Sequence, residues 1–400
     1  MIELLIIADD VTGALDTGCQ FGKRGISTAV YPGGVLPWQA LPPGLRVAVV
    51  NTDSRHLPAA QARERVHRLA LEGIRHGVLR IFKKIDSALR GNLDSELQAL
   101  LDTGICDRLY LLPAYPDSGR TTENGLQLLN GRGISRSDYG RDPFSPVPSS
   151  RITDLLSGPV HTVPLTAPLP EEPGLWVLDA VSNSHLEARC REFPAGPLLI
   201  AGCAGLAAAL AGHMAPEVLP PVSTPGPCRK LLIVSGSLHP VSRAQIGRAH
   251  AAGIPRVTCS GSPEAAAHAL AEAFRHSSAA ILEAPASREP GCAPGIMAES
   301  LAHAVQLLYE TEAPLTLAVF GGDTLLAIAA RLFREALCPL AEVLPGVPVS
   351  KTRDHEGRRL CLISKSGGFG PENVVEQITA YVFSENQGGN HNDTNHARHL

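Results

Sequence analysis

The chain has 400 residues, of which 44% are hydrophobic, and its formal net charge at pH 7 is -4. This length exceeds a single typical core, so two domains are expected, and the hydrophobic content is sufficient to bury both cores. The negative charge provides no basic surface for a polyanion. This argues against nucleic acid as the main partner and favours a small-molecule substrate.

The nine cysteines are scattered singly without a CxxC pair, so the sequence indicates neither a disulfide framework nor a zinc site. The N-terminus has no basic region, and the apolar run before Asp9 is shorter than the roughly 7–15 residues of a signal peptide's apolar core. The least charged stretch, residues 197–215, is rich in Ala and Gly and contains His213, so a buried strand and helix are expected there rather than a membrane span. A reducing, cytoplasmic location without membrane contact is therefore expected.

The first half of the chain alternates short apolar runs with helix-length amphipathic stretches. This alternation is typical of an α/β domain with a mostly parallel sheet. The expected strands are Leu4–Ala8, Val47–Val50, Val78–Phe82, Leu109–Leu112, Leu175–Leu178 and Leu198–Ala201.

Polar clusters follow the first four of these runs: DDVTG, NTDSRHLP, KKIDSALRGN and PAYPDSGRTTENG. In an open parallel sheet, ligands bind beyond the carboxyl ends of the strands. A single polar cluster could be an ordinary strand end. Four clusters that combine acids with Arg55, Lys84, Arg90 and Arg120 indicate a shared site.

A Pro-rich stretch, LPPVSTPGPC at residues 219–228, has the composition of a linker. The alternation then restarts, with expected strands at Lys230–Val234, Pro255–Thr258, Ala279–Leu282 and Leu315–Phe320, and two more joined by a tight turn in VPVSKTRDHEGRRLCLISKSGG. We therefore expect two α/β domains, 1–222 and 228–384, followed by a loosely attached or disordered polar tail at 385–400.

Three glycine clusters occur in the second half: SGSLHP at 235–240, GGDT at 321–324 and KSGGFG at 365–370. Glycine lets a backbone approach an anion closely, and amides at a helix N-terminus attract phosphate. Each cluster alone could serve turn geometry, but three in one domain favour nucleotide binding. GxxxxGK[ST], GxGxxG and the protein-kinase motifs are absent, so the common nucleotide fingerprints do not apply.

Six motifs, in order, resemble those of the four-carbon acid sugar kinases, which phosphorylate threonate, erythronate and related acids with ATP. They are IADDVTGALDTG, KKIDSALRGN, PAYPDSGRTTENG with YGRDPFSPV, VSGSLHPVSRAQI, FGGDTLLAI, and GVPVSK with LISKSGGFG, and they span most of the chain. The resemblance implies an N-terminal sugar-acid domain, a C-terminal nucleotide domain and an active site in the cleft between them. The sequence departs from the pattern at Ala88, where a hydroxyl residue is expected, and at Leu238-His239, which replaces a more polar pair.

A sugar acid presents one carboxylate and several hydroxyls. Arg55 and Arg90 are candidates to clamp the carboxylate, since guanidinium binds it bidentately, and a surface salt bridge is the alternative for both. Arg120 could meet the substrate or the transferred phosphoryl group. The residues expected to hold hydroxyls or to orient the substrate are Asp9, Asp10, Lys84, Asp86 and Ser87.

Phosphoryl transfer requires alignment, charge neutralisation and an acceptor for the hydroxyl proton. Asp10 is our candidate base, and Asp323 is its rival because an acid beside the γ-phosphate could act as base or hold Mg²⁺. The residues expected to contact ATP are Ser237, Gly321, Gly322, Asp323, Thr324, Gly367 and Gly368.

The expected function is that of an ATP- and Mg²⁺-dependent kinase of a four-carbon sugar acid, namely threonate, erythronate or a 2-oxo-tetronate, in carbohydrate-acid catabolism. One alternative is a non-catalytic sensor that closes on the same ligands without transfer. Another is a ribokinase-like kinase of a different small polyol, prompted by GGDT alone. The sequence leaves open the substrate stereochemistry, the phosphorylated hydroxyl and the oligomeric state, and a homodimer is compatible with it.

Overall fold

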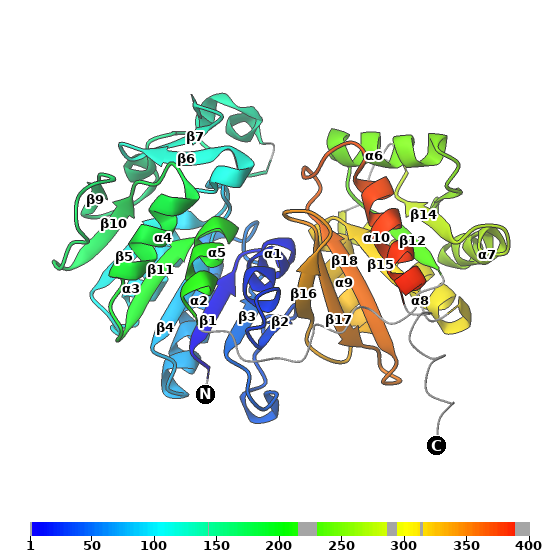
Figure 1. Cartoon of the computed structure of the whole chain (residues 1–400), viewed down its shortest axis with the longest axis horizontal. Coiled ribbons are helices and arrows are strands. Elements are labelled where there is room, and N and C mark those ends of the chain that lie inside the picture. Colours follow the sequence, from blue (N-terminus) through cyan, green and yellow to red (C-terminus); the bar gives the residue numbers. More distant parts are fainter. Residues whose placement is uncertain (1, 143, 215–229, 286–293, 313–314, 389–400) are drawn as a thin grey trace, which may run out of the picture. The chain divides into compact units, whose positions relative to one another are not determined.

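The computed structural model describes residues 2–142, 144–214, 230–285, 294–312 and 315–388 (Figure 1). The chain divides into two compact units, Met1–Leu219 and Pro220–Leu400. The Pro-rich stretch at 219–228, which includes both predicted domain boundaries, lies outside the described residues.

The first unit is built on an eight-stranded sheet whose neighbouring strands all run parallel, in the order β2-β3-β1-β4-β11-β5-β10-β9. Its strands are β1 (Leu4–Ala8), β2 (Thr28–Tyr31), β3 (Val47–Asn51), β4 (Arg80–Lys84), β5 (Arg108–Leu112), β9 (Val160–Val163), β10 (Gly174–Leu178) and β11 (Leu198–Gly202). Strands β1 and β3 are buried at every position, as expected for a parallel sheet with helices on both faces.

Within the described residues, the helices that cover this sheet are α1 (Val11–Gly22), α2 (Ala59–Arg75), α3 (Leu93–Leu101), α4 (Asn183–Glu192) and α5 (Ala204–His213). Helices α1 and α4 both contact α5, whereas α2 contacts α3. Because strand–helix–strand crossovers are right-handed, the strand order places these two groups on opposite faces. The predicted α/β architecture is confirmed.

A small antiparallel sheet follows β5 in the chain: β6 (Arg120–Glu123), β7 (Leu126–Leu129) and β8 (Arg132–Gly133). Short 3₁₀ turns accompany it and the loops, at η1 (Trp38–Ala40), η2 (Pro116–Ser118), η3 (Ile134–Arg136), η4 (Asp138–Arg141) and η5 (Ile152–Leu155). This region has no counterpart among the predicted elements.

The second unit has a seven-stranded sheet of order β13-β14-β12-β15-β18-β17-β16, in which β17 runs antiparallel to both of its neighbours, β16 and β18. Its strands are β12 (Leu231–Ser235), β13 (Arg256–Thr258), β14 (Ala279–Glu283), β15 (Thr316–Phe320), β16 (Cys338–Glu342), β17 (Pro348–Arg353) and β18 (Arg359–Lys365). The predicted pair of strands joined by a tight turn is the β17–β18 hairpin, and that prediction is confirmed.

The helices of this unit are α6 (Pro240–Ala251), α7 (Pro263–Ala273), α8 (Pro294–Glu312), α9 (Gly322–Leu332) and α10 (Val374–Gly388). Contacts join α7, α8 and α9 in one group and α6 with α10 in another. Helix α10 continues to Gly388, so it extends into the tail predicted from 385 onward. The rest of that tail, 389–400, lies outside the described residues.

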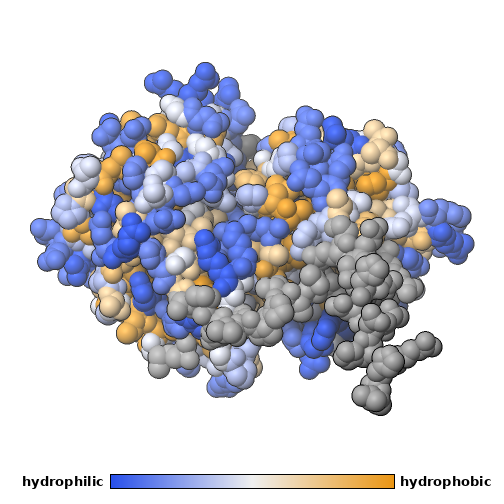
Figure 2. Space-filling model, in the orientation of Figure 1, coloured by the Kyte–Doolittle hydropathy of each residue, from blue (hydrophilic) through white to orange (hydrophobic). Residues whose placement is uncertain are grey.

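Figure 2 shows hydrophilic side chains over much of the visible face of each unit, with apolar side chains among them. Among the described residues, no helix has the length and apolar character needed to cross a bilayer.

Candidate active site

The carboxyl edge of the first sheet brings the predicted substrate residues together. The register pairs Ala8 of β1 with Asn51 of β3 and with Lys84 of β4, so the segments after these strands leave the sheet side by side. These segments are the first three of the four polar clusters. The fourth joins them through contacts of Arg120 that are described below.

Arg55 links the two aspartates that follow β1. Its Nε donates to Asp9 Oδ2 at 2.7 Å, its Nη2 donates to Asp10 Oδ1 at 2.6 Å, and Asp86 Oδ1 lies 3.9 Å from the same Nη2. Burial by itself raises the pKa of Asp10, but the positive charges of Arg55 and Lys84 outweigh it and lower this pKa to about 2. Asp10 is therefore ionised at neutral pH.

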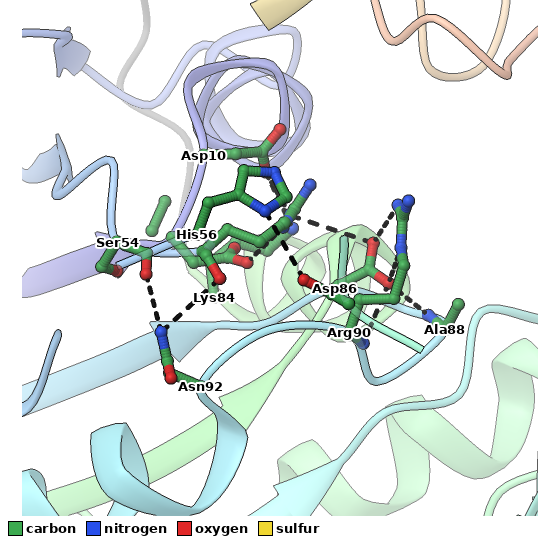
Figure 3. Close-up of polar contacts among 12 residues, drawn as sticks. Asp10, Ser54, His56, Lys84, Asp86, Ala88, Arg90 and Asn92 are labelled. Atoms are coloured by element: carbon green, nitrogen blue, oxygen red, sulfur yellow. Dashed lines mark hydrogen bonds and ion pairs between the residues drawn. The ribbon is translucent and has the colours of Figure 1, made fainter. Parts of the chain in front are cut away.

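Arg90 holds Asp86 in the same way. Its Nε and Nη2 donate to the two carboxylate oxygens of Asp86 at 2.9 and 3.0 Å, and its Nη1 donates to Asp142 Oδ2 at 3.1 Å. The backbone N–H of Ala88 also donates to Asp86, and Figure 3 shows Arg90 and Ala88 around this carboxylate. Burial opposes ionisation of Asp86, but Arg90 and Arg55 hold its pKa well below the usual range. Every guanidinium nitrogen of Arg90 is thus engaged by a carboxylate of the chain.

Two other buried cations, Lys84 and Arg120, have N–H donors that the described part of the chain does not use. Lys84 Nζ lies 4.0 Å from Asp10 Oδ1 and makes no hydrogen bond within the described part of the chain. Arg120 Nη2 donates to the Tyr139 hydroxyl at 2.7 Å, while its buried Nε has no partner among the described residues. Burial raises the pKa of the Cys203 thiol to about 11, although the positive charges of Lys84 and Arg120 oppose that rise.

Gly13 leaves room for the Lys84 ammonium over the first turn of α1. A Cβ on Gly13 would lie 2.5 Å from Asp10 Oδ1 and closer still to Lys84 Nζ. Such separations are far below van der Waals contact. The glycine of the DDVTG motif is therefore required by the close approach of the lysine to the helix.

Tyr139 and Asp142 complete this side of the site. The Tyr139 ring, in η4, lies 5.1 Å from the guanidinium carbon of Arg90 and 5.5 Å from that of Arg120. Asp142, just after η4, pairs with Arg90. Sequence reasoning matched the segment YGRDPFSPV but assigned no role to these two residues. The available signal was an aromatic residue and an acid in a loop between two arginine-bearing motifs.

A buried ion pair supports the turn that carries Arg55. Lys83 Nζ lies 3.0 Å from Glu96 Oε2, and Ser54 Oγ donates to the other oxygen of the same carboxylate. Burial raises the pKa of Glu96, and the Lys83 ammonium opposes that rise. Asn92 Nδ2 donates to the Ser54 carbonyl at 2.9 Å, a contact drawn in Figure 3. These bonds tie α3 to β4 and to the residues just before Arg55.

Two further oxygens of the site are available as hydrogen-bond partners. The Ser87 hydroxyl makes no hydrogen bond within the described residues, although its carbonyl accepts from Gln127 Nε2 at 2.9 Å. Asp9 Oδ1 is buried without a partner among the described residues. The structure thus brings Asp9, Asp10, Arg55, Lys84, Asp86, Ser87, Arg90 and Arg120 to one sheet edge.

The glycine loops of the second unit likewise meet at one sheet edge. Ser235 of β12 pairs with Phe320 of β15, which pairs with Lys365 of β18. The Ser242 hydroxyl of α6 donates to the Gly367 carbonyl at 2.6 Å. A Cβ on Gly367 would collide with Ser237 Oγ, so the loops after β12 and β18 pack directly against each other.

The GGDT loop lies beside these two. The Gly321 amide donates to the Lys365 carbonyl at 3.0 Å, and a Cβ on Gly236 would lie 3.2 Å from Thr324 Cβ. Gly322 begins α9, and Asp323 is exposed in the first turn of that helix. The residues predicted to contact the nucleotide therefore form a cluster: Ser237, Gly321, Gly322, Asp323, Thr324, Gly367 and Gly368.

Comparison with known proteins identifies both units. A sugar-binding N-terminal domain model matches residues 4–210, and a nucleotide-binding C-terminal domain model matches residues 232–375. A D-threonate kinase of Salmonella typhimurium is 30% identical, over 95% of this chain and 98% of its own. The chain belongs to the four-carbon acid sugar kinase family. The family predicted from the motifs is confirmed.

Other members of the kinase family show the same range of similarity. A D-threonate kinase of Bordetella bronchiseptica is 30% identical, over 92% of this chain and 95% of its own. A D-erythronate kinase of Heliobacterium modesticaldum is 31% identical, over 62% of this chain and 60% of its own. A solved structure from Salmonella typhimurium has a TM-score of 0.75 at 22% identity, over 94% of this chain and 99% of its own, and so shares the fold.

Proposed function

We propose that this family member transfers the γ-phosphoryl group of ATP to a hydroxyl of a four-carbon sugar acid, either threonate, erythronate or an oxo-tetronate. The observation that carries the proposal is the pair of buried cations, Lys84 and Arg120, which have unused donors at the sheet edge that also carries the ionised Asp10. This is the combination that a polyhydroxylated carboxylate requires. Relatives over most of the chain bear the names of kinases for such acids.

We assign the substrate carboxylate to Lys84 and Arg120, with Nη1 of Arg55 as a third donor. Each guanidinium nitrogen of Arg90 already donates to Asp86 or Asp142, so we assign Arg90 instead to holding these two carboxylates in place. A substrate carboxylate gains more binding free energy from a cation with unused donors than from a cation whose donors are already engaged in ion pairs.

The substrate hydroxyls are assigned to the acceptors of the same edge, namely Asp9, Asp10, Asp86 and the Ser87 hydroxyl. In the transfer, the hydroxyl oxygen forms a bond to the γ-phosphorus, the bond from that phosphorus to the bridging oxygen breaks, and ADP leaves. The hydroxyl proton goes to a carboxylate, for which Asp10 is the first candidate and Asp323 the second. A low pKa of Asp10 is compatible with this role, since the transition state is largely dissociative.

The nucleotide is assigned to residues 228–384 and the sugar acid to residues 1–222. Phosphates would meet the amides of the glycine loops and the N-termini of α6 and α9. Mg²⁺, when bound, neutralises charge on the phosphate oxygens. No group of three or more His, Cys, Asp or Glu side chains suited to a metal occurs in the described residues, so we expect Mg²⁺ to enter with ATP, and the exposed Asp323 carboxylate to contact it.

The test is ADP release by the purified protein, given ATP, Mg²⁺ and a panel of threonates, erythronates and oxo-tetronates. We expect turnover with one of these acids and its loss in Asp10→Asn or Asp323→Asn. Asp107→Asn is the matched control, because the Asp107 side chain is 62% exposed just before β5, at the other edge of the sheet. Ligand binding without ADP release across an enlarged panel would favour the sensor instead.

A further inference from the structure

Lys365 is a buried lysine at the end of β18, where the KSGGFG loop begins. Its side chain is 1% exposed, and no carboxylate in the described part of the chain forms an ion pair with it. Burial lowers its pKa to about 7. A buried ammonium without a counter-charge is costly, so the charged form, which prevails below about pH 7, depends on stabilisation by other groups.

The stabilising groups are oxygens of the loop itself. Lys365 Nζ lies within hydrogen-bond distance of four oxygens, which share its three N–H donors: the carbonyls of Ser366 at 2.8 Å, Phe369 at 3.0 Å and Gly367 at 3.3 Å, and Ser242 Oγ at 3.3 Å. It also lies 4.5 Å from the centroid of the Phe320 ring. Converging carbonyl oxygens are the means by which proteins bind bare cations, and an aromatic face adds to that attraction. The loop therefore surrounds a cation that is tethered to the chain.

The direction of these carbonyls determines the direction of the amides. In a trans peptide group, the C=O of one residue and the N–H of the next point in opposite directions. The carbonyls of Ser366 and Gly367 point at Lys365 Nζ, so the amides of Gly367 and Gly368 point away from it. Neither amide has a hydrogen-bond acceptor among the described residues. Two unused donors are thus left on the side of the loop opposite the lysine.

We infer that residues 366–370 with Ser242 form a carbonyl-lined cation site, that the Lys365 ammonium is its built-in occupant, and that this occupancy aims the Gly367 and Gly368 amides at nucleotide phosphates. Lys365 is then a positioning residue. The role of the Gly367 and Gly368 amides in binding phosphate rests on the proposed function, whereas the cation site does not. Direct contact of Lys365 with phosphate is disfavoured, because its ammonium is already surrounded by four oxygens.

The test is Lys365→Ala in the full chain, which leaves the carbonyls without their cation. Hydrogen exchange of the Phe369 amide, which donates to the Ser366 carbonyl at 3.2 Å, reports on the loop, and calorimetric binding of ADP reports on the phosphate site. We expect faster exchange and an ADP affinity lowered by roughly tenfold or more, since two charge-assisted hydrogen bonds are misaligned. Methylammonium chloride should restore both quantities, whereas tetramethylammonium chloride at equal ionic strength should not, because it cannot donate hydrogen bonds.

Lys230→Ala is the matched control. Lys230 precedes β12 at the opposite edge of the same sheet and pairs with Glu312, so its loss should not change either quantity selectively. Unchanged exchange in Lys365→Ala, or a loss that methylammonium cannot reverse, would overturn the cation site. Faster exchange with unchanged ADP affinity would overturn the positioning role alone. Failure of the unmodified protein to bind ADP would instead contradict the proposed function, and the exchange measurement would still test the cation site.

Lys365→Met serves if the alanine variant does not fold. Methionine fills the same space without a charge, so the cost of burying an ammonium disappears while the orientation of the loop is lost. We expect a thermal unfolding midpoint near that of the unmodified protein together with weakened ADP binding. A merely structural role predicts the opposite combination, a lowered midpoint with unchanged ADP affinity.

Discussion

Lys84 and Arg120 differ from Arg90 in how much of their hydrogen-bonding capacity the chain already uses. Arg90 meets two carboxylates with all its nitrogens, whereas Lys84 has only a 4.0 Å approach to Asp10, and Arg120 keeps a buried Nε without a partner in the described residues. A buried donor without an acceptor costs free energy in the empty site, and a bound carboxylate removes that cost. The residues with unsatisfied donors are therefore the ones on which substrate affinity should depend most.

Arg120→Gln should raise the KM for the sugar acid more than it lowers kcat. Removing one partner of a charged hydrogen bond costs roughly 1.5–3 kcal/mol, which corresponds to roughly a ten- to hundredfold higher KM. Steady-state kinetics with the accepted acid give both constants. Arg63→Gln is the control, because Arg63 pairs with Asp102 on an exposed face. An unchanged KM would contradict the assignment of Arg120 to the carboxylate.

Gly13→Ala should reduce activity although alanine is the better helix former. Alanine favours a helix over glycine by roughly 1 kcal/mol, but here its Cβ would occupy the space of Asp10 Oδ1 and Lys84 Nζ. Gly212 in α5 offers the matched substitution, since a Cβ there would meet nothing within 4 Å. We expect Gly212→Ala to keep activity and to unfold at the same or a higher temperature, and Gly13→Ala to lose most of its kcat/KM.

At the scale of elements, the ion pairs of Asp10 and Asp86 connect the carboxyl ends of β1, β3 and β4. The pKa of Asp10 falls to about 2 in the folded protein, against an ordinary value of 3.8. A carboxyl whose pKa is depressed by folding stabilises the fold above its unfolded pKa, and this contribution is lost as the pH falls through the folded value. Stability from this group should therefore be complete above pH 4 and absent below pH 2.

Asp10→Asn should unfold more easily than the unmodified protein near pH 5, by on the order of 2 kcal/mol, and the two should converge as the pH approaches 2. Urea denaturation followed by tryptophan fluorescence measures this, because both tryptophans, Trp38 and Trp176, lie in the first unit. The exposed Asp107 again provides the control substitution. Parallel stability curves for Asp10→Asn and the unmodified protein would contradict a depressed pKa for Asp10.

Most of the strands that sequence could predict are short apolar runs such as β1 and β3, and the β17–β18 hairpin was predicted with its polar turn. The predicted run Val78–Phe82 became β4 (Arg80–Lys84), because Lys83 is buried within the strand by its pairing with Glu96, a partner that periodicity cannot reveal. Strand β6 reads RTTE and β8 has two residues, so neither carries an apolar pattern. These short strands depend on tertiary contacts rather than on their own composition.

The part of the site that could be predicted from sequence is the part whose position follows from the parallel arrangement of the strands. Residues that directly follow parallel strands share an edge, which is why Asp10, Lys84 and Arg55 could be grouped from sequence. Tyr139 and Asp142 reach that edge through the small antiparallel sheet, whose course no local pattern specifies. The carboxylate partners of the arginines likewise depend on distances between side chains, which sequence does not give.

At the scale of the whole molecule, each unit has its own sheet, its own buried core and its own match to a domain model. Units of this size with separate cores can fold independently. Each proposed ligand also has its predicted contacts within a single unit. Binding energy for the sugar acid should therefore reside in residues 1–222, and that for the nucleotide in residues 228–384.

Separate expression of residues 1–222 and 228–384 tests this division. A ligand at 100 times its Kd stabilises the folded form by roughly 2.7 kcal/mol, which raises the Tm of a fragment of this size by roughly 5–10 °C. The accepted sugar acid should produce this shift only in the first fragment and ADP only in the second, as measured by differential scanning calorimetry. Neither fragment alone should release ADP from ATP faster in the presence of the acid, because the hydroxyl and the γ-phosphate are then bound by different molecules. A rise in the Tm of the first fragment with ADP would instead mean that residues 1–222 carry part of the nucleotide site.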